Sequence, residues 1–133
     1  MSPNGKTAYA VSPGGFRGPG TVTPINTSSN AAGRPITVGM RPFAMAITPN
    51  GRTAYVVNAL SRTVTPFQTA TGKTGKAIKV GLDPEGILIT PDGRTAYVAN
   101  LNSVTPIRLA TRTPGRKIEI EGFPPTILEL VFS

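Results

Sequence analysis

The segment Thr48-Pro-Asn-Gly-Arg-Thr-Ala-Tyr-Val-Val-Asn58 occurs three times in this chain, with few changes. The copy from Thr90 to Asn100 reads Thr-Pro-Asp-Gly-Arg-Thr-Ala-Tyr-Val-Ala-Asn. The copy from Ser2 to Ser12 reads Ser-Pro-Asn-Gly-Lys-Thr-Ala-Tyr-Ala-Val-Ser. Tyr55 and Tyr97 are 42 residues apart, and Tyr9 and Tyr55 are 46 residues apart. A period of this length is typical of folds that stack one supersecondary unit several times.

Each copy predicts four short strands, named a to d in chain order. Strand a is apolar, strand b is rich in residues that suit a pleated sheet, and strand d alternates polar and apolar residues. An Asn-Gly or Asp-Gly turn joins strands a and b. In the last complete copy the strands are expected at Gly86–Thr90, Thr95–Asn100, Ser103–Arg108 and Arg116–Ile120, with a polar loop at Thr111–Gly115. Together with the period, this predicts an all-β fold, a β-propeller with one four-stranded blade per repeat.

A proline interrupts strand c in every copy, at Pro24, Pro66 and Pro106. Proline has no N–H to donate to a β-ladder. Because the exception is repeated three times, we expect either a regular bulge or a position that makes no ladder hydrogen bond.

The strands add up to three blades within one domain, residues 1–133. The blade equivalents are expected at about 1–38 without an inner strand, at 43–80, at 85–120, and as a lone inner strand at 126–132. Closed propellers have roughly four to eight blades. We therefore predict a two-fold homodimer that closes into a six-bladed ring, in which strand 126–132 of one copy completes the first blade of the other. The alternative is a fragment of a longer propeller.

The composition narrows the function classes. The chain has no cysteine, which excludes disulfides and thiolate metal sites and leaves the redox compartment open. It has no histidine, the usual general base and the commonest metal ligand. Its six acidic residues are scattered, and its serines and threonines have no neighbouring base. We expect no catalytic residues, no metal site and no cofactor, and also no transmembrane segment and no signal peptide in this chain.

The formal net charge of +8 suits an anionic partner. In an up-and-down blade the a–b turns and c–d loops share one face, and this face is expected to attract polyanions, such as nucleic acid, acidic polysaccharide or membrane headgroups. The alternative is that these charges only keep the protein soluble. The candidate residues are Lys6, Arg34, Arg52, Lys73, Lys76, Arg94, Arg112, Arg116 and Lys117.

The opposite face is close to neutral, and three of its residues are candidates for a second site. Arg41, Asp83 and Glu85 lie in the d–a loops, which open toward the axis of a propeller. The two acids suit an oxygen-ligand metal site, although ordinary loop positions explain them more simply.

Two further residue types recur on strand b. Tyr9, Tyr55 and Tyr97 are expected to pack between blades. Asn58 and Asn100 are expected to cap the b–c turn.

The repeat resembles that of the YVTN family of β-propellers, on the strength of Tyr55–Asn58 and Tyr97–Asn100, each preceded by Thr-Pro-Asn/Asp-Gly. The Val-Gly-x-x-Pro steps at Val38–Pro42 and Val80–Pro84 also match, whereas Tyr9–Ser12 departs from the pattern. The resemblance implies a scaffold or binding protein, without assigned activity, in a secreted or cell-surface setting. Because some related propellers are lactonases, part of a lactonase-like hydrolase is the alternative function.

Overall fold

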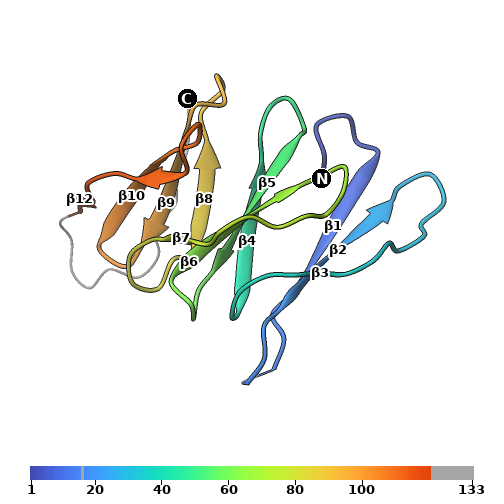
Figure 1. The fold of residues 1–133 in the computed structure, drawn as a ribbon, viewed down its shortest axis with the longest axis horizontal. Helices are drawn as coiled ribbons and strands as arrows, with labels where there is room; N and C mark the ends of the chain where they lie inside the picture. The colour runs from blue at the N-terminus through green and yellow to red at the C-terminus, as the bar shows by residue number, and fades with distance from the viewer. Residues whose placement is uncertain (16, 121–133) are drawn as a thin grey trace.

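The structure, a computed structural model, describes residues 1–15 and 17–120. These residues form an all-β fold of twelve strands in three antiparallel sheets. Figure 1 shows the three sheets standing side by side along the molecule, each twisted relative to the next. None of the described residues forms a helix long and apolar enough to cross a membrane. The strand expected at 126–132 lies outside the described residues.

Strands that follow one another in the chain are neighbours in each sheet, except that the last two strands of the third sheet both pair with the strand that precedes them. The first sheet contains β1 (Thr7–Ser12), β2 (Thr21–Asn26) and β3 (Ile36–Thr37). The second contains β4 (Pro42–Ile47), β5 (Thr53–Asn58), β6 (Thr63–Gln68) and β7 (Ile78–Lys79). The third contains β8 (Gly86–Ile89), β9 (Thr95–Asn100), β10 (Ser103–Arg108), β11 (Thr113–Pro114) and β12 (Ile118–Glu119).

The expected loop at Thr111–Gly115 is wrong in part, because Thr113–Pro114 forms the strand β11. This strand pairs with Ile107 and Arg108 at the end of β10. The pairing exists because the c–d segment turns back and runs along the outer edge of strand c. The edge position tolerates a proline, since no further strand needs its missing N–H.

The prolines of strand c lie in an unbroken ladder rather than at bulges. Each is opposite the tyrosine of strand b with no shift in register. The carbonyl of Pro66 accepts a hydrogen bond of 2.8 Å from the Gly75 N–H on the outer side of the sheet. The nitrogen of the same residue faces that side too, because the N–H and C=O of a strand residue point the same way. Proline therefore occupies a position at which strand b needs no donor. This confirms the expectation of a position without a ladder hydrogen bond, rather than a bulge.

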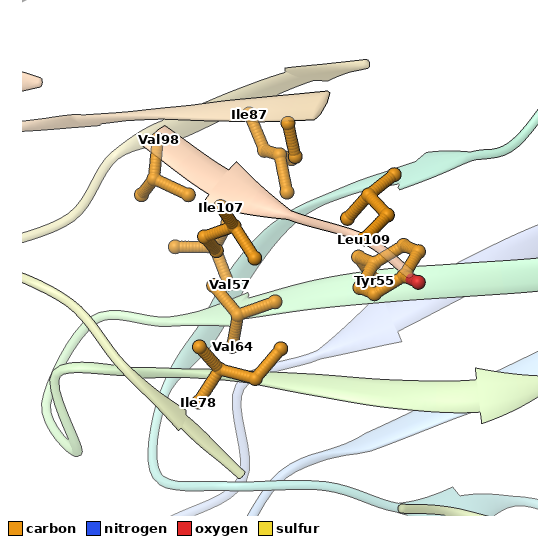
Figure 2. Close-up of a cluster of buried hydrophobic side chains, with 9 residues drawn as sticks. Tyr55, Val57, Val64, Ile78, Ile87, Val98, Ile107 and Leu109 are labelled. Atoms are coloured by element: carbon orange, nitrogen blue, oxygen red, sulfur yellow. The ribbon is translucent and has the colours of Figure 1, made fainter. Parts of the chain in front are cut away.

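The hydrophobic core lies between the sheets and alternates along strand b. Ala54 and Val56 pack against the first sheet, and Tyr55 and Val57 pack against the third. This follows from the two-residue period of a strand, which sends successive side chains to opposite faces. Figure 2 shows the cluster between the second and third sheets, where β5, β6 and β7 contribute Tyr55, Val57, Val64 and Ile78 against Ile87, Val98, Ile107 and Leu109.

Each outer sheet has one face that the middle sheet covers and another face that no described sheet covers. β4 pairs with the inner edge of β5 and β8 with that of β9, whereas among the described residues β1 is paired only with β2. Ile78 of β7 is 4% exposed because the third sheet packs on it, while Ile118 of β12 is 47% exposed. Three blades' worth of strands thus form a partial propeller, whose open surfaces fit completion by partners.

Candidate functional site

Backbone hydrogen bonds divide the loops between two faces. The turn face consists of the a–b turns at 4–6, 50–52 and 92–94 together with the c–d loops that begin at Thr27, Thr69 and Leu109. In every sheet the first residue of the c–d loop donates its N–H to the last residue of the a–b turn. The three bonds are Thr27 to Lys6 (3.1 Å), Thr69 to Arg52 (3.0 Å) and Leu109 to Arg94 (2.9 Å).

The crossover face contains the b–c turns and the d–a loops between sheets. Here the Ala59 N–H donates to the Arg41 carbonyl at 2.9 Å, and the Leu101 N–H donates to the Leu82 carbonyl at 2.9 Å. The up-and-down order of the strands therefore places the loops on the two faces that the sequence suggested.

The a–b turns hold basic side chains out toward solvent. The side-chain oxygen of Asp92 accepts hydrogen bonds from the Thr90 hydroxyl (2.6 Å) and from the Arg94 N–H (3.0 Å). These two bonds, with the hydroxyl bond the larger cause, hold the pKa of Asp92 below its ordinary value of 3.8. Gly93 adopts a φ of 73°, which a tight turn requires. Asn50 has the same place in the second sheet and accepts the same two bonds.

The structure divides the nine basic candidates into two groups. Lys6, Arg52, Lys73, Arg94 and Arg112 lie in turns or loops of the turn face. Arg34, Lys76, Arg116 and Lys117 lie along the outer rim, beside the strands of type d. The reason is the return of the c–d segment along strand c: Gly33, Gly75 and Gly115 donate to the mid-strand proline carbonyls, so the residues that follow them have already left the turn face.

Arg108 also borders the turn face, and the sequence did not suggest it. It is the exposed last residue of β10, directly opposite Thr95 in the ladder. The sequence places Arg108 at the end of strand c, directly after Pro-Ile. The pairing of Arg108 with Thr95, next to the a–b turn, is what shows that this strand end lies at the turn face.

A groove of about 610 Å³ opens on the turn face between the second and third sheets. Its lining includes Thr53 at the start of β5 and Arg94, Thr95 and Arg108 of the third sheet. Tyr55 also lines it, although this residue is only 3% exposed. No described residue forms a hydrogen bond with the Tyr55 hydroxyl, and that oxygen is not sealed from solvent. The expected packing of Tyr55 between blades is confirmed for its ring. Its hydroxyl, by contrast, borders the groove.

A related hollow of about 390 Å³ lies between the first and second sheets. Tyr9 takes the place of Tyr55 there, and Arg34, Thr37 and Thr69 contribute to the lining. Partial burial raises the pKa of Tyr9, so its hydroxyl keeps its proton and remains a donor near neutral pH. The ring of Tyr9 packs at 6.0 Å from that of Phe67.

The crossover face brings together the other three candidates. Arg41, Asp83 and Glu85 line a hollow of about 240 Å³ with the exposed side chains of Phe43 and Leu60. Arg41 and Asp83 occupy equivalent loop positions and both have a positive φ, of 52° and 48°. In the described part of the chain, no three acidic, histidine or cysteine side chains are close enough together to hold a metal ion.

The asparagines at the end of strand b do more than cap a turn. Asn100 reaches Ser103 across the b–c turn, as expected, but its side-chain oxygen also accepts a 3.1 Å bond from the Gly81 N–H. Asn58 accepts the same bond from Gly39. These bonds join each blade to the connection that enters it, a link that the sequence showed only as two motifs recurring with the same period.

No protein-family model matches the sequence, and no curated protein matches it. Among solved structures, the chain is similar to a hydrazine synthase from Kuenenia stuttgartiensis, with a TM-score of 0.83 and 34% identity over 90% of this chain and 34% of that one. It is also similar to U3-55K and to the WD40 repeats of RRP9, each with a TM-score of 0.78, 12% identity and coverage of 90% of this chain and 37% of theirs.

These likenesses show the β-propeller fold. The chain spans about a third of the length of each of the three structures.

Proposed function

We propose that this protein is a non-catalytic β-propeller module of the YVTN repeat type, whose open blade surfaces are covered by a second copy of the chain. The observation that carries the proposal is the contrast between Ile78 and Ile118. Both belong to strand d, yet Ile78 is 4% exposed against the third sheet and Ile118 is 47% exposed.

The chain itself shows what kind of surface fits such a face. Phe67 lies on the face of the second sheet that packs against the first sheet, and Ile107 lies on the face of the third sheet that packs against the second. Both side chains are fully buried there. Ile25 has the same place in the first sheet and is only half-buried. One outer sheet therefore presents the face that receives a blade, and the other presents the face that a blade offers. Joining them buries apolar surface, at about 25 cal/mol for each Å².

The YVTN assignment is supported by the structural roles of the repeated residues. The asparagine of Tyr-Val-Val-Asn and the glycine of Val-Gly-x-x-Pro are the two partners of the Asn58–Gly39 hydrogen bond. The resemblance also leads us to propose an exported or cell-surface location, which cell fractionation with an antibody against the chain would test.

Light scattering after size exclusion tests the proposed dimer. We expect a mass of about twice the 13.8 kDa of one chain, independent of dilution in the micromolar range. Ile118→Asp places a charge on the exposed face and is expected to give a folded monomer. Ser28→Asp adds the same charge to an exposed loop of the first sheet and should leave the dimer intact. A wild-type protein that is a folded monomer would contradict the proposal.

A second function is favoured by the charges of the turn face, which we propose binds polyanions. Five basic candidates and Arg108 lie on it, and its described acidic residue is Asp92. Binding of a fluorescent double-stranded DNA of mixed sequence and of heparin should weaken steeply with salt, with a DNA slope of about −0.9 for each phosphate neutralised. Absence of binding to both probes at 50 mM salt would contradict this function.

A further inference from the structure

The groove between the second and third sheets has a buried floor with a polar group in it. Figure 2 shows the Tyr55 ring beside Leu109, with its hydroxyl oxygen directed away from the aliphatic side chains of the cluster. The residue is 3% exposed, lines the groove, and has no hydrogen-bond partner among the described residues. A nearly buried hydroxyl is normally hydrogen-bonded. This one is open to the groove and to whatever occupies it.

The walls above this hydroxyl combine positive charge with a further hydroxyl. Arg94 comes from the a–b turn and Arg108 from the end of β10, and both are exposed at the rim. Thr53 is half-buried on the same side of β5 as Tyr55, and no hydrogen bond engages its hydroxyl within the described residues. Thr95 borders the groove, but its side chain alternates with Ala96 and therefore points to the opposite face of the third sheet. A guanidinium group binds carboxylate or sulfate through paired N–H donors, while a hydroxyl both donates and accepts.

We propose that this groove binds an acidic sugar unit of a polysaccharide. Arg94 and Arg108 at the rim pair with its carboxylate or sulfate group, and the hydroxyls of Tyr55 and Thr53 bond with its sugar hydroxyls. The inference rests on the proposed binding of polyanions by the turn face, and it names the class of polyanion.

A saccharide fits this groove better than a single-stranded nucleic acid does. Non-specific binding of single strands depends on bases stacked on exposed aromatic rings. The aromatic ring in the described lining is that of Tyr55, and it is buried between sheets. What the groove offers is the hydroxyl groups of Tyr55 and Thr53, which can both donate to and accept from the hydroxyls of a sugar.

The hollow at Tyr9 extends the argument from one unit to a polymer. It also combines a strand-b tyrosine with an arginine and threonines, although its arginine, Arg34, comes from the outer rim and its threonines come from β3 and from the c–d loop of the second sheet. An acidic polysaccharide carries its charges at regular intervals, so one chain can occupy both sites. Two linked sites raise the overall affinity through effective concentration.

Isothermal titration at 50 mM salt, with a galacturonic acid hexamer and a heparin-derived hexasaccharide as probes, tests the site. The double variant Arg94→Gln/Arg108→Gln is expected to weaken binding of at least one probe by about tenfold or more. Arg17→Gln/Arg62→Gln removes equal charge outside the turn face and should weaken it by no more than about twofold. Tyr55→Phe keeps the buried ring and removes only the hydroxyl, for an expected loss of about threefold to tenfold.

The outcomes separate the groove from the face. Equal losses in the two double variants would show attraction by net charge alone and overturn the groove while leaving the turn face as a polyanion surface. No binding of either hexamer, DNA or heparin would overturn both proposals. A twelve-residue oligothymidine that binds more tightly than the hexamers, and is lost with Arg94→Gln/Arg108→Gln, would overturn the choice of sugar. Unchanged affinity in a Tyr55→Phe protein with an unchanged melting temperature would overturn the hydroxyl's role.

Discussion

The side-chain oxygen of Asn58 accepts a hydrogen bond of 3.1 Å from the backbone N–H of Gly39, in the connection that leads into its own blade. The amide nitrogen of the same side chain donates to the Thr65 hydroxyl at 2.8 Å. One fully buried amide therefore fastens strands b and c to the connection from the preceding sheet. Asn100 repeats both bonds with Gly81 and Thr105.

Removing this amide is expected to destabilise the fold. Asn58→Ala leaves the Gly39 N–H and the Thr65 hydroxyl without their partner in a buried site, and each unsatisfied group costs about 1–3 kcal/mol. We expect the free energy of unfolding, measured with urea, to fall by about 2–4 kcal/mol. Gln68→Ala, at the exposed end of β6, is the control and should change it by less than about 0.5 kcal/mol. Equal midpoints for the two variants would contradict the proposed role of Asn58.

The glycine side of the same bond gives an independent prediction. A Cβ at Gly39 would lie 2.6 Å from Cγ of Asn58, which is closer than two carbon atoms can approach. Gly39→Ala is expected to lower the free energy of unfolding by about 1–3 kcal/mol, because Asn58 must move and lose its hydrogen bonds. Gly86→Ala is the matched control, since a Cβ there meets nothing within 4 Å. It should be neutral or stabilising by up to about 1 kcal/mol. Thermal unfolding of the two variants side by side checks the difference.

The strand pattern was readable from the sequence because it depends on local chemistry. Thr95–Asn100 and Ser103–Arg108 have the bounds that their composition and flanking turns suggested. The two faces of loops followed from strand order alone. By contrast, the bond between Asn58 and Gly39 joins the end of β5 to a residue 19 positions earlier, in the connection from the first sheet. No local sequence pattern predicts that these residues are in contact. The only indication is that the asparagine and the glycine recur with the same spacing, at Asn58 and Asn100 and at Gly39 and Gly81.

The candidate site was less predictable, because it depends on where the chain goes after a loop. Lys76 follows a loop of the turn face, yet the Gly75–Pro66 hydrogen bond has already brought the chain down the outer rim. The groove requires the packing distance between two sheets and the burial of Tyr55, neither of which a single sequence contains. Arg108 illustrates the same limit, since its neighbours in the groove come from another strand and another turn.

Two isoleucines in the same strand of successive sheets should respond differently to truncation. Ile78→Ala removes a side chain that packs against the third sheet and is expected to cost about 2–4 kcal/mol of unfolding free energy. Ile118→Ala should cost less than about 0.5 kcal/mol at protein concentrations that favour the monomer. If a second copy covers Ile118, this variant should instead shift the dimer dissociation constant, measured by analytical ultracentrifugation. A large loss of monomer stability in Ile118→Ala would contradict the open face.

The turns of strands a and b should differ in their response to acid. The folded pKa of Asp92 lies below its ordinary value of 3.8, so the turn's contribution to stability is present above that value and is lost as the pH falls through the folded pKa. Asn50 makes the same bonds to Thr48 and Arg52 without a titrating group. The backbone amide signal of Arg94 in nuclear magnetic resonance should therefore titrate in acid while that of Arg52 should not. Asp92→Asn should abolish the Arg94 titration and leave stability at pH 7 unchanged, since asparagine supplies the same acceptor. An Arg94 titration that persists in Asp92→Asn would show that another group reports there and that the aspartate bond does not govern this turn.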